Sequence, residues 1–136
     1  MTILELYEVR NLRDELKREI ERQRSLEAAI DGLTVTLDGL PRPPNHTSRT
    51  ERLAVLLVDT SEIIRELNER IITAAVNLTE KIFAAELTDY ERKILQLRYV
   101  KGLSFNAIAA EVNLSRSYMF RIHSDALKKA TRKGLE

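Results

Sequence analysis

A strict alternation of four- and three-residue steps runs through the middle of this chain. From Leu53 to Leu78 these steps carry apolar residues or Thr, and Ile82 and Phe83 extend the series toward Glu86. Such spacing places side chains along one stripe of an α-helix, as in coiled coils. The stripe consists of Leu53, Leu57, Thr60, Ile64, Leu67, Ile71, Ala74 and Leu78. It predicts a long helix that needs another long helix as its partner.

A second amphipathic helix is predicted from Ile3 to Ile30, which lack Gly and Pro and carry apolar residues at helical steps. It can fold back on the later helix as an antiparallel hairpin, or each later helix can pair with the same helix of another subunit. Ser48 and Glu51 have capping-box spacing, so the later helix is expected to begin near Arg49. Since the first helix is then the shorter one, we expect a homodimer through the long helices.

Residues 31–48 are expected to be a Pro-rich connector between these helices. Asp31 and Gly32 are residues that commonly end a helix, and residues 33–37 alternate apolar side chains with Thr. A single strand of this length has no partner in the chain. We therefore expect an extended connector over one end of the helical core, with a short hairpin or intermolecular strand pairing as the alternative.

The C-terminal third follows three local rules of helix and turn formation. Thr88 and Glu91 form a second capping box, and the helix after them is expected to end at Lys101-Gly102. Ser104 and Ser115 are placed to cap two further helices, separated by Asn113, which tolerates a positive φ. Seven positions have helix-turn-helix spacing: Ile108, Ala109, Val112, Asn113, Leu114, Met119 and Ile122. Ala126 and Leu127 are also expected to point inward from the last helix.

Charge is divided unevenly along the chain. The formal net charge is +1 over the whole chain, but it is −4 for residues 1–87 and +5 for residues 88–136. Because phosphate binding depends on Lys and Arg, the basic segment favours double-stranded DNA as a partner of the helix-turn-helix. The acidic segment suits protein contacts.

Several other classes of function are not expected. The chain has no Cys, and its two His residues are isolated: His46 lies in the connector, and His123 is expected to be a boundary polar residue. We therefore expect no metal site, cofactor or catalytic residue, and no enzymatic activity. The apolar runs are too short to span a membrane and the N-terminus lacks a basic signal region, so a cytoplasmic protein is expected.

The helix that follows Ser115 is the expected recognition helix, and most of the candidate DNA-contacting residues lie on it. Arg116 and Arg121 are expected to read bases, because a guanidinium pairs bidentately with guanine. Ser117 and Ser124 can bond to bases, and Phe120 either meets a thymine methyl or belongs to the core. The candidate phosphate contacts are Lys101, Ser104, Ser115, Tyr118, Lys128, Lys129, Arg132 and Lys133.

Three segments of this region, 87–102, 104–115 and 122–129, resemble region 4 of bacterial sigma factors, the module that reads the promoter −35 element. The whole layout, with a Pro-Arg-Pro-Pro stretch before a long helix, resembles the phage and prophage late-transcription regulators of the ArpU/RinA type. This resemblance implies a transcriptional regulator that acts at promoters, with bacterial RNA polymerase as a possible partner, in a bacterial cell or a phage-infected host.

The sequence thus predicts an all-α protein with two parts. Residues 1–86 form a long, coiled-coil-like helical hairpin for oligomerisation or partner binding, and residues 87–136 form a trihelical helix-turn-helix domain for DNA binding. The expected function is sequence-specific transcription regulation. The alternatives are a phage DNA-packaging initiation subunit of the small terminase kind, and an adaptor that contacts RNA polymerase or a sigma factor without binding DNA.

Overall fold

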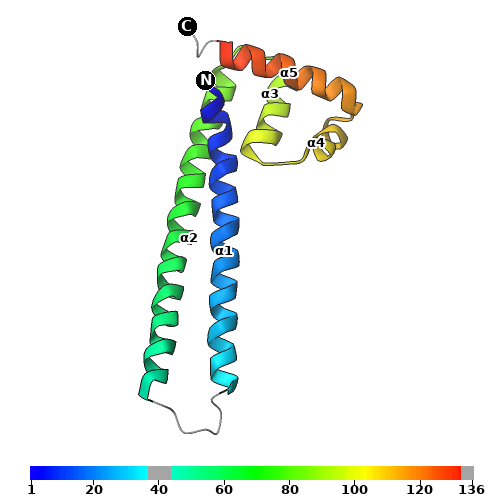
Figure 1. Cartoon of the computed structure of the whole chain (residues 1–136). Coiled ribbons are helices and arrows are strands. Elements are labelled where there is room, and N and C mark those ends of the chain that lie inside the picture. The colour runs from blue at the N-terminus through cyan, green and yellow to red at the C-terminus, as the bar shows by residue number, and fades with distance from the viewer. Residues whose placement is uncertain (37–43, 133–136) are drawn as a thin grey trace. The chain divides into compact units, whose positions relative to one another are not determined.

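The computed structural model describes the backbone of residues 1–36 and 44–132, and this part of the chain is all-α. It contains no strand, so the predicted fold class is correct (Figure 1). Among the described residues, no helix combines the length and the apolar character that crossing a membrane requires. The elements are α1 (Ile3–Thr36), α2 (Pro44–Ala84), α3 (Asp89–Leu95), the π-helical turn η1 (Gln96–Val100), α4 (Phe105–Val112) and α5 (Arg116–Arg132).

The chain divides into two compact units, and a part of α1 lies beside an antiparallel part of α2 in each (Figure 1). One unit consists of Arg13–Glu69, where Gln23 Nε2 donates to Ser61 Oγ over 2.9 Å. The other joins Met1–Leu12 to the chain from Arg70 onward. There Lys81 Nζ and Glu5 Oε1 form an ion pair of 2.9 Å. The predicted antiparallel hairpin is therefore present.

The predicted stripe is the face that α2 buries. Ala74, Leu78 and Ile82 are buried in the same unit as the α1 residues Leu6 and Val9. In the other unit Leu67 and Thr60 are buried, and the Thr60 hydroxyl donates to the Leu56 carbonyl over 2.8 Å, which satisfies its polar group. One expectation for the end of the stripe was wrong, because Phe83 is 59% exposed whereas Ile82 is fully buried.

The segment between the two long helices is shorter than the predicted connector of residues 31–48. The α1 helix continues through Gly32 to Thr36, so residues 33–36 are helical and not extended. A single Gly costs a helix only about 1 kcal/mol relative to Ala, and the spacing of Leu26, Ile30 and Leu33 continues the helical stripe past it. The α2 helix begins at Pro44, not near Arg49, and Pro suits the first turn of a helix. Residues 37–43 lie outside the described part of the chain.

Candidate nucleic-acid interface

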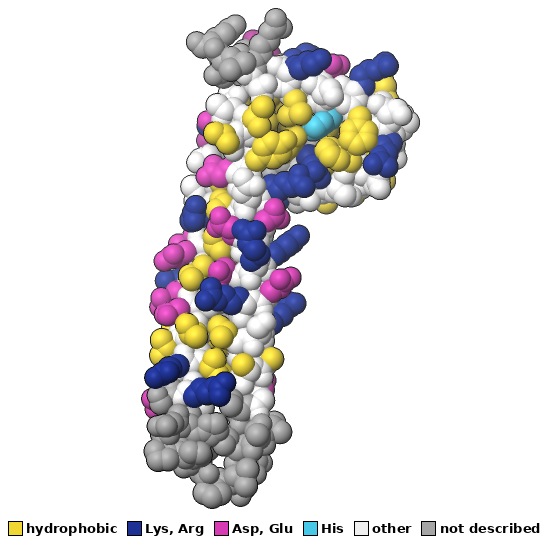
Figure 2. Space-filling model, viewed as in Figure 1, with side chains coloured by type: hydrophobic (Ala, Val, Ile, Leu, Met, Phe, Trp, Pro, Cys, Tyr) yellow, Lys and Arg dark blue, Asp and Glu magenta, His cyan; other side chains and the backbone are white. Residues whose placement is uncertain are grey.

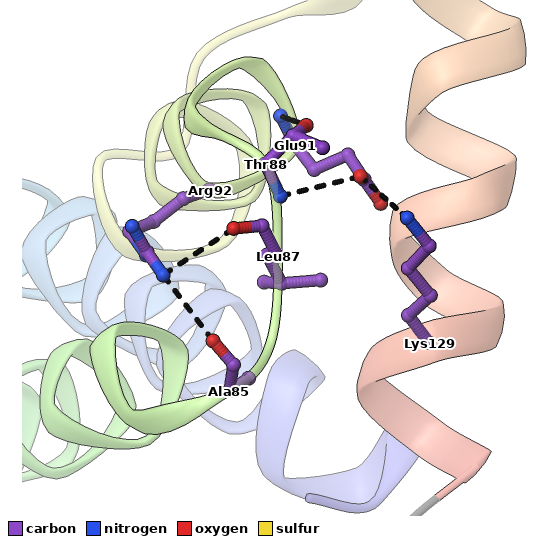
Figure 3. Close-up of polar contacts among 6 residues, drawn as sticks. All are labelled: Ala85, Leu87, Thr88, Glu91, Arg92 and Lys129. Carbon is purple, nitrogen blue, oxygen red and sulfur yellow. Dashed lines mark hydrogen bonds and ion pairs between the residues drawn. The ribbon is translucent and has the colours of Figure 1, made fainter.

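The helix α3 begins with the predicted capping box. The Glu91 amide donates to Thr88 Oγ1 over 3.2 Å, and the Thr88 amide donates to Glu91 Oε1 over 3.3 Å. Glu91 is buried, and its Oε1 also accepts a hydrogen bond of 2.8 Å from Lys129 of α5 (Figure 3). The capping box therefore also ties α3 to the recognition helix.

Arg92 of α3 fixes the junction between α2 and α3. Arg92 Nη2 donates to the Ala85 carbonyl over 3.2 Å and to the Leu87 carbonyl over 3.4 Å (Figure 3). Its guanidinium also lies 5.7 Å from the centre of the exposed Phe83 ring. These bonds satisfy carbonyl groups beyond the end of α2, where no further helical turn supplies a partner.

The charge of Glu91 is stabilised by its partners. Burial by itself would raise the pKa of Glu91, but the hydrogen bonds from Lys129 and Thr88 outweigh it and hold the pKa below its ordinary value of 4.5. A carboxylate whose pKa is lowered in the folded state contributes stability above its unfolded pKa. This contribution is lost as the pH falls through the folded pKa.

Replacing Glu91 with Gln should lower the free energy of unfolding at pH 7 by about 1 kcal/mol, because Gln preserves the capping box but not the ion pair to the half-exposed Lys129. The variant should also lose part of the decline in stability that the parent shows below about pH 4.5. Urea denaturation at several pH values measures both effects. Glu111→Gln is the control, since Glu111 is an exposed carboxylate of the same domain that forms no ion pair among the described residues. Equal pH profiles for the parent and Glu91→Gln would contradict this role.

The two turns around α4 have the predicted geometry. Gly102 has a φ of 75°, and Asn113 adopts the left-handed conformation with a φ of 56°. The Ser104 hydroxyl accepts from the Ala107 amide, and the Ser115 hydroxyl accepts from the Tyr118 amide. These caps and turns set the path from α3 through α4 to α5, as helix-turn-helix architecture requires.

One apolar cluster holds the three helices together. Ile94, Leu97, Ile108, Val112 and Met119 are all buried in it. They come from α3, η1, α4 and α5, so one side of the recognition helix is anchored in the core. The opposite side remains available to a ligand.

The base-reading candidates occupy the outer side of α5, with one exception. Arg116, Ser117, Arg121 and Ser124 are exposed. Phe120 is half-buried, and its ring lies 4.8 Å from that of Phe105, so the structure favours the core interpretation of this residue.

The phosphate candidates fall into four groups. Lys129 is half-exposed but paired with Glu91, and the side chains of Arg132 and Lys133 lie outside the described part. Ser104 and Ser115 are exposed at helix starts, where backbone amides attract anions. The remaining three side chains, Lys101, Tyr118 and Lys128, are exposed.

Arg98 is a residue of this region that the sequence analysis missed. It lies in η1, where its guanidinium stacks 4.0 Å from the centre of the Phe105 ring and donates to the Leu103 carbonyl over 3.0 Å. Burial and the nearby charge of Arg10 lower the pKa of Arg98. No sequence motif identified it, because its ring partner is supplied by the next helix.

His123 is not the boundary residue that the sequence indicated. It is 8% exposed, and its Nε2 lies 2.8 Å from the Tyr99 hydroxyl in a buried hydrogen bond. Burial, then the charge of Arg98, lowers the pKa of His123, while burial and Tyr7 raise the pKa of Tyr99 to about 12. This bond occupies the His ring, and the described residues contain no cluster of three potential metal ligands.

Residues 84–129 match the family described as Sigma-70, region 4. The matched segment includes α3, η1, α4 and most of α5, so it coincides with the helix-turn-helix described above. The match supports a sigma region 4-like helix-turn-helix domain and points to a DNA-binding regulator. Comparisons of the chain with curated proteins and with solved structures found no match.

Proposed function

We propose that this chain is a sequence-specific DNA-binding transcription regulator of the phage or prophage type, which acts at promoters with the host RNA polymerase. The observation that carries the proposal is the outer side of α5. It presents Arg116 and Arg121 to solvent while Met119 anchors the helix in the core. The protein has no catalytic role in this proposal, and its primary partner is double-stranded DNA.

The recognition helix α5 would enter the major groove with its first turns at the base edges. Arg116 and Arg121 would each donate two hydrogen bonds to a guanine, which discriminates against other bases by about 1 to 3 kcal/mol per contact. Ser117 and Ser124 add shorter polar contacts from the same side. These four side chains determine the sequence that is read.

Phosphate contacts would set the position of α5 on the duplex without reading sequence. Ser104 and Ser115 mark the starts of α4 and α5, and the backbone amides at these helix starts would attract phosphates of the DNA. The exposed Lys101 and Lys128 add charge. Lys129 contributes less than the sequence suggested, because Glu91 already neutralises it.

A single helix-turn-helix reads few base pairs, so the proposal includes a second source of specificity. Residues 1–86 would supply it, either through a homodimer that places two reading helices on the DNA or through contact with RNA polymerase. The support is that α2, among its described residues, leaves six large aliphatic side chains exposed. These are Val55, Leu56, Val58, Ile63, Ile72 and Val76.

The test is selection of bound fragments from a genomic DNA library by the purified protein, with and without RNA polymerase, together with the mass of the protein in solution. Enrichment of promoter fragments by a monomer or dimer supports the proposal. A large ring of subunits would favour DNA packaging instead. Capture of polymerase without enrichment of any DNA would leave the adaptor as the better explanation.

A further inference from the structure

Two adjacent aromatic rings with a cationic side chain at each end connect α5 to η1. The guanidinium of Arg116 lies 5.5 Å from the centre of the Phe120 ring, and that ring lies 4.8 Å from Phe105. The guanidinium of Arg98 lies 4.0 Å from the centre of the Phe105 ring. We call these four residues the cation–aromatic row. Through this row the base-reading end of α5 is continuous with η1.

The first turns of α1 lie beside η1, the element that carries Arg98. The rings of Tyr7 and Tyr99 meet edge to face with centroids 5.7 Å apart, and Leu6 and Val9 are fully buried. Arg10 is exposed and lies on α1 one helical turn after Tyr7, so it is on the side of α1 that meets η1, and its charge is one of the causes that lower the pKa of Arg98. A surface of the molecule with hydrophobic side chains around the histidine also carries Lys and Arg side chains at its edge (Figure 2).

Arg10 and Arg98 form no ion pair with any described residue. The ion pairs of the described residues involve Lys81, Arg92 and Lys129, and none includes Arg10 or Arg98. Two like charges that repel each other gain most from an anion placed between them. The adjoining row ends at Arg116, which faces DNA in the proposed function, and a DNA duplex carries a negative charge about every 1.7 Å of its axis.

We propose that Arg10 of α1, together with Arg98 of η1, binds a phosphate of the DNA backbone beside the recognition helix. The N-terminal helix is then part of the DNA interface and not only an oligomerisation element. Phe120 acts through Arg116, whose guanidinium it supports, and does not touch a base. This inference rests on the proposed function, since it requires that α5 occupies the groove.

The experiment compares Arg10→Ala with the parent in DNA titrations over a range of salt concentrations. Arg22→Ala is the matched control, because Arg22 is an exposed Arg of the same helix in the other compact unit. Losing one phosphate contact should reduce the slope of log affinity against log salt by about 0.9. The affinity should fall by the same factor for specific and for random duplexes, and Arg10→Lys should restore most of it.

The outcomes separate this inference from the proposed function. If the parent, Arg22→Ala and Arg10→Ala all show the same slope of log affinity against log salt, Arg10 makes no phosphate contact. The proposed function would still stand in that case. If the parent binds no DNA at all, both fail. Circular dichroism of each variant shows that the helices are retained, as expected for exposed side chains.

Discussion

Replacing Met119 with alanine is expected to destabilise the helix-turn-helix by about 2 to 5 kcal/mol. Met119 is fully buried at the centre of the cluster that joins α3, η1, α4 and α5. The substitution removes dispersion contacts within this cluster and leaves a cavity that the surrounding side chains fill only in part. Since domains of this size are marginally stable, a loss of this magnitude should unfold a measurable fraction of the domain near room temperature.

Urea denaturation followed by far-UV circular dichroism measures this loss. Ser117→Ala is the matched control, because Ser117 is exposed on the same helix and its replacement should change stability by no more than about 0.5 kcal/mol. Equal destabilisation by the two substitutions would show that Met119 does not anchor α5.

Replacing Arg121 with alanine is expected to lower the affinity for the protein's own site by about 5- to 150-fold, the equivalent of about 1 to 3 kcal/mol. Arg121 is exposed on the outer side of α5, so its removal should leave the fold intact. Affinity for random duplexes should change much less. Arg116→Ala should behave similarly, and it also removes one end of the cation–aromatic row.

Titrations of the selected site and of a random duplex at one salt concentration measure this effect. Lys101→Ala serves as the contrasting variant, because a phosphate contact weakens binding to all sequences alike. If Arg121→Ala and Lys101→Ala both lowered the two affinities by equal factors, Arg121 would be a phosphate contact and not a base contact.

The parts of the domain that the sequence predicted depend on neighbours within a few residues. The box of Thr88 and Glu91, the left-handed Asn113 and the caps Ser104 and Ser115 each need a partner one turn away. The same rule was overlooked at the start of α1, where Thr2 and Glu5 exchange two hydrogen bonds of the capping-box kind. Local chemistry of this type is visible in a single sequence.

The parts that the sequence did not predict depend on distant partners. Lys129 meets Glu91 and His123 meets Tyr99 only after α5 has packed across α3 and η1. The half-buried position of Phe120 likewise depends on Phe105 of another helix. Residue type and spacing predicted these side chains as surface groups. They did not indicate which of them would instead form contacts inside the fold.

The bounds of the long helices were misjudged for a different reason. Gly32 was taken to end α1 and Ser48 to begin α2, yet α1 reaches Thr36 and α2 starts at Pro44. Local stop and start signals carry about 1 kcal/mol each. At Gly32 the apolar spacing of Leu26, Ile30 and Leu33 runs past the stop signal. At the start of α2, Pro44 is itself a residue suited to the first turn of a helix.

The most direct test of the central claim is the ratio of two dissociation constants, for the duplex selected from genomic DNA and for a random duplex of equal length, at one physiological salt concentration. A base-reading α5 predicts binding to the selected duplex that is tighter by about 100-fold or more, and a ratio that falls toward one in the Arg116→Ala, Arg121→Ala double variant. A ratio of one for the parent protein would contradict the claim.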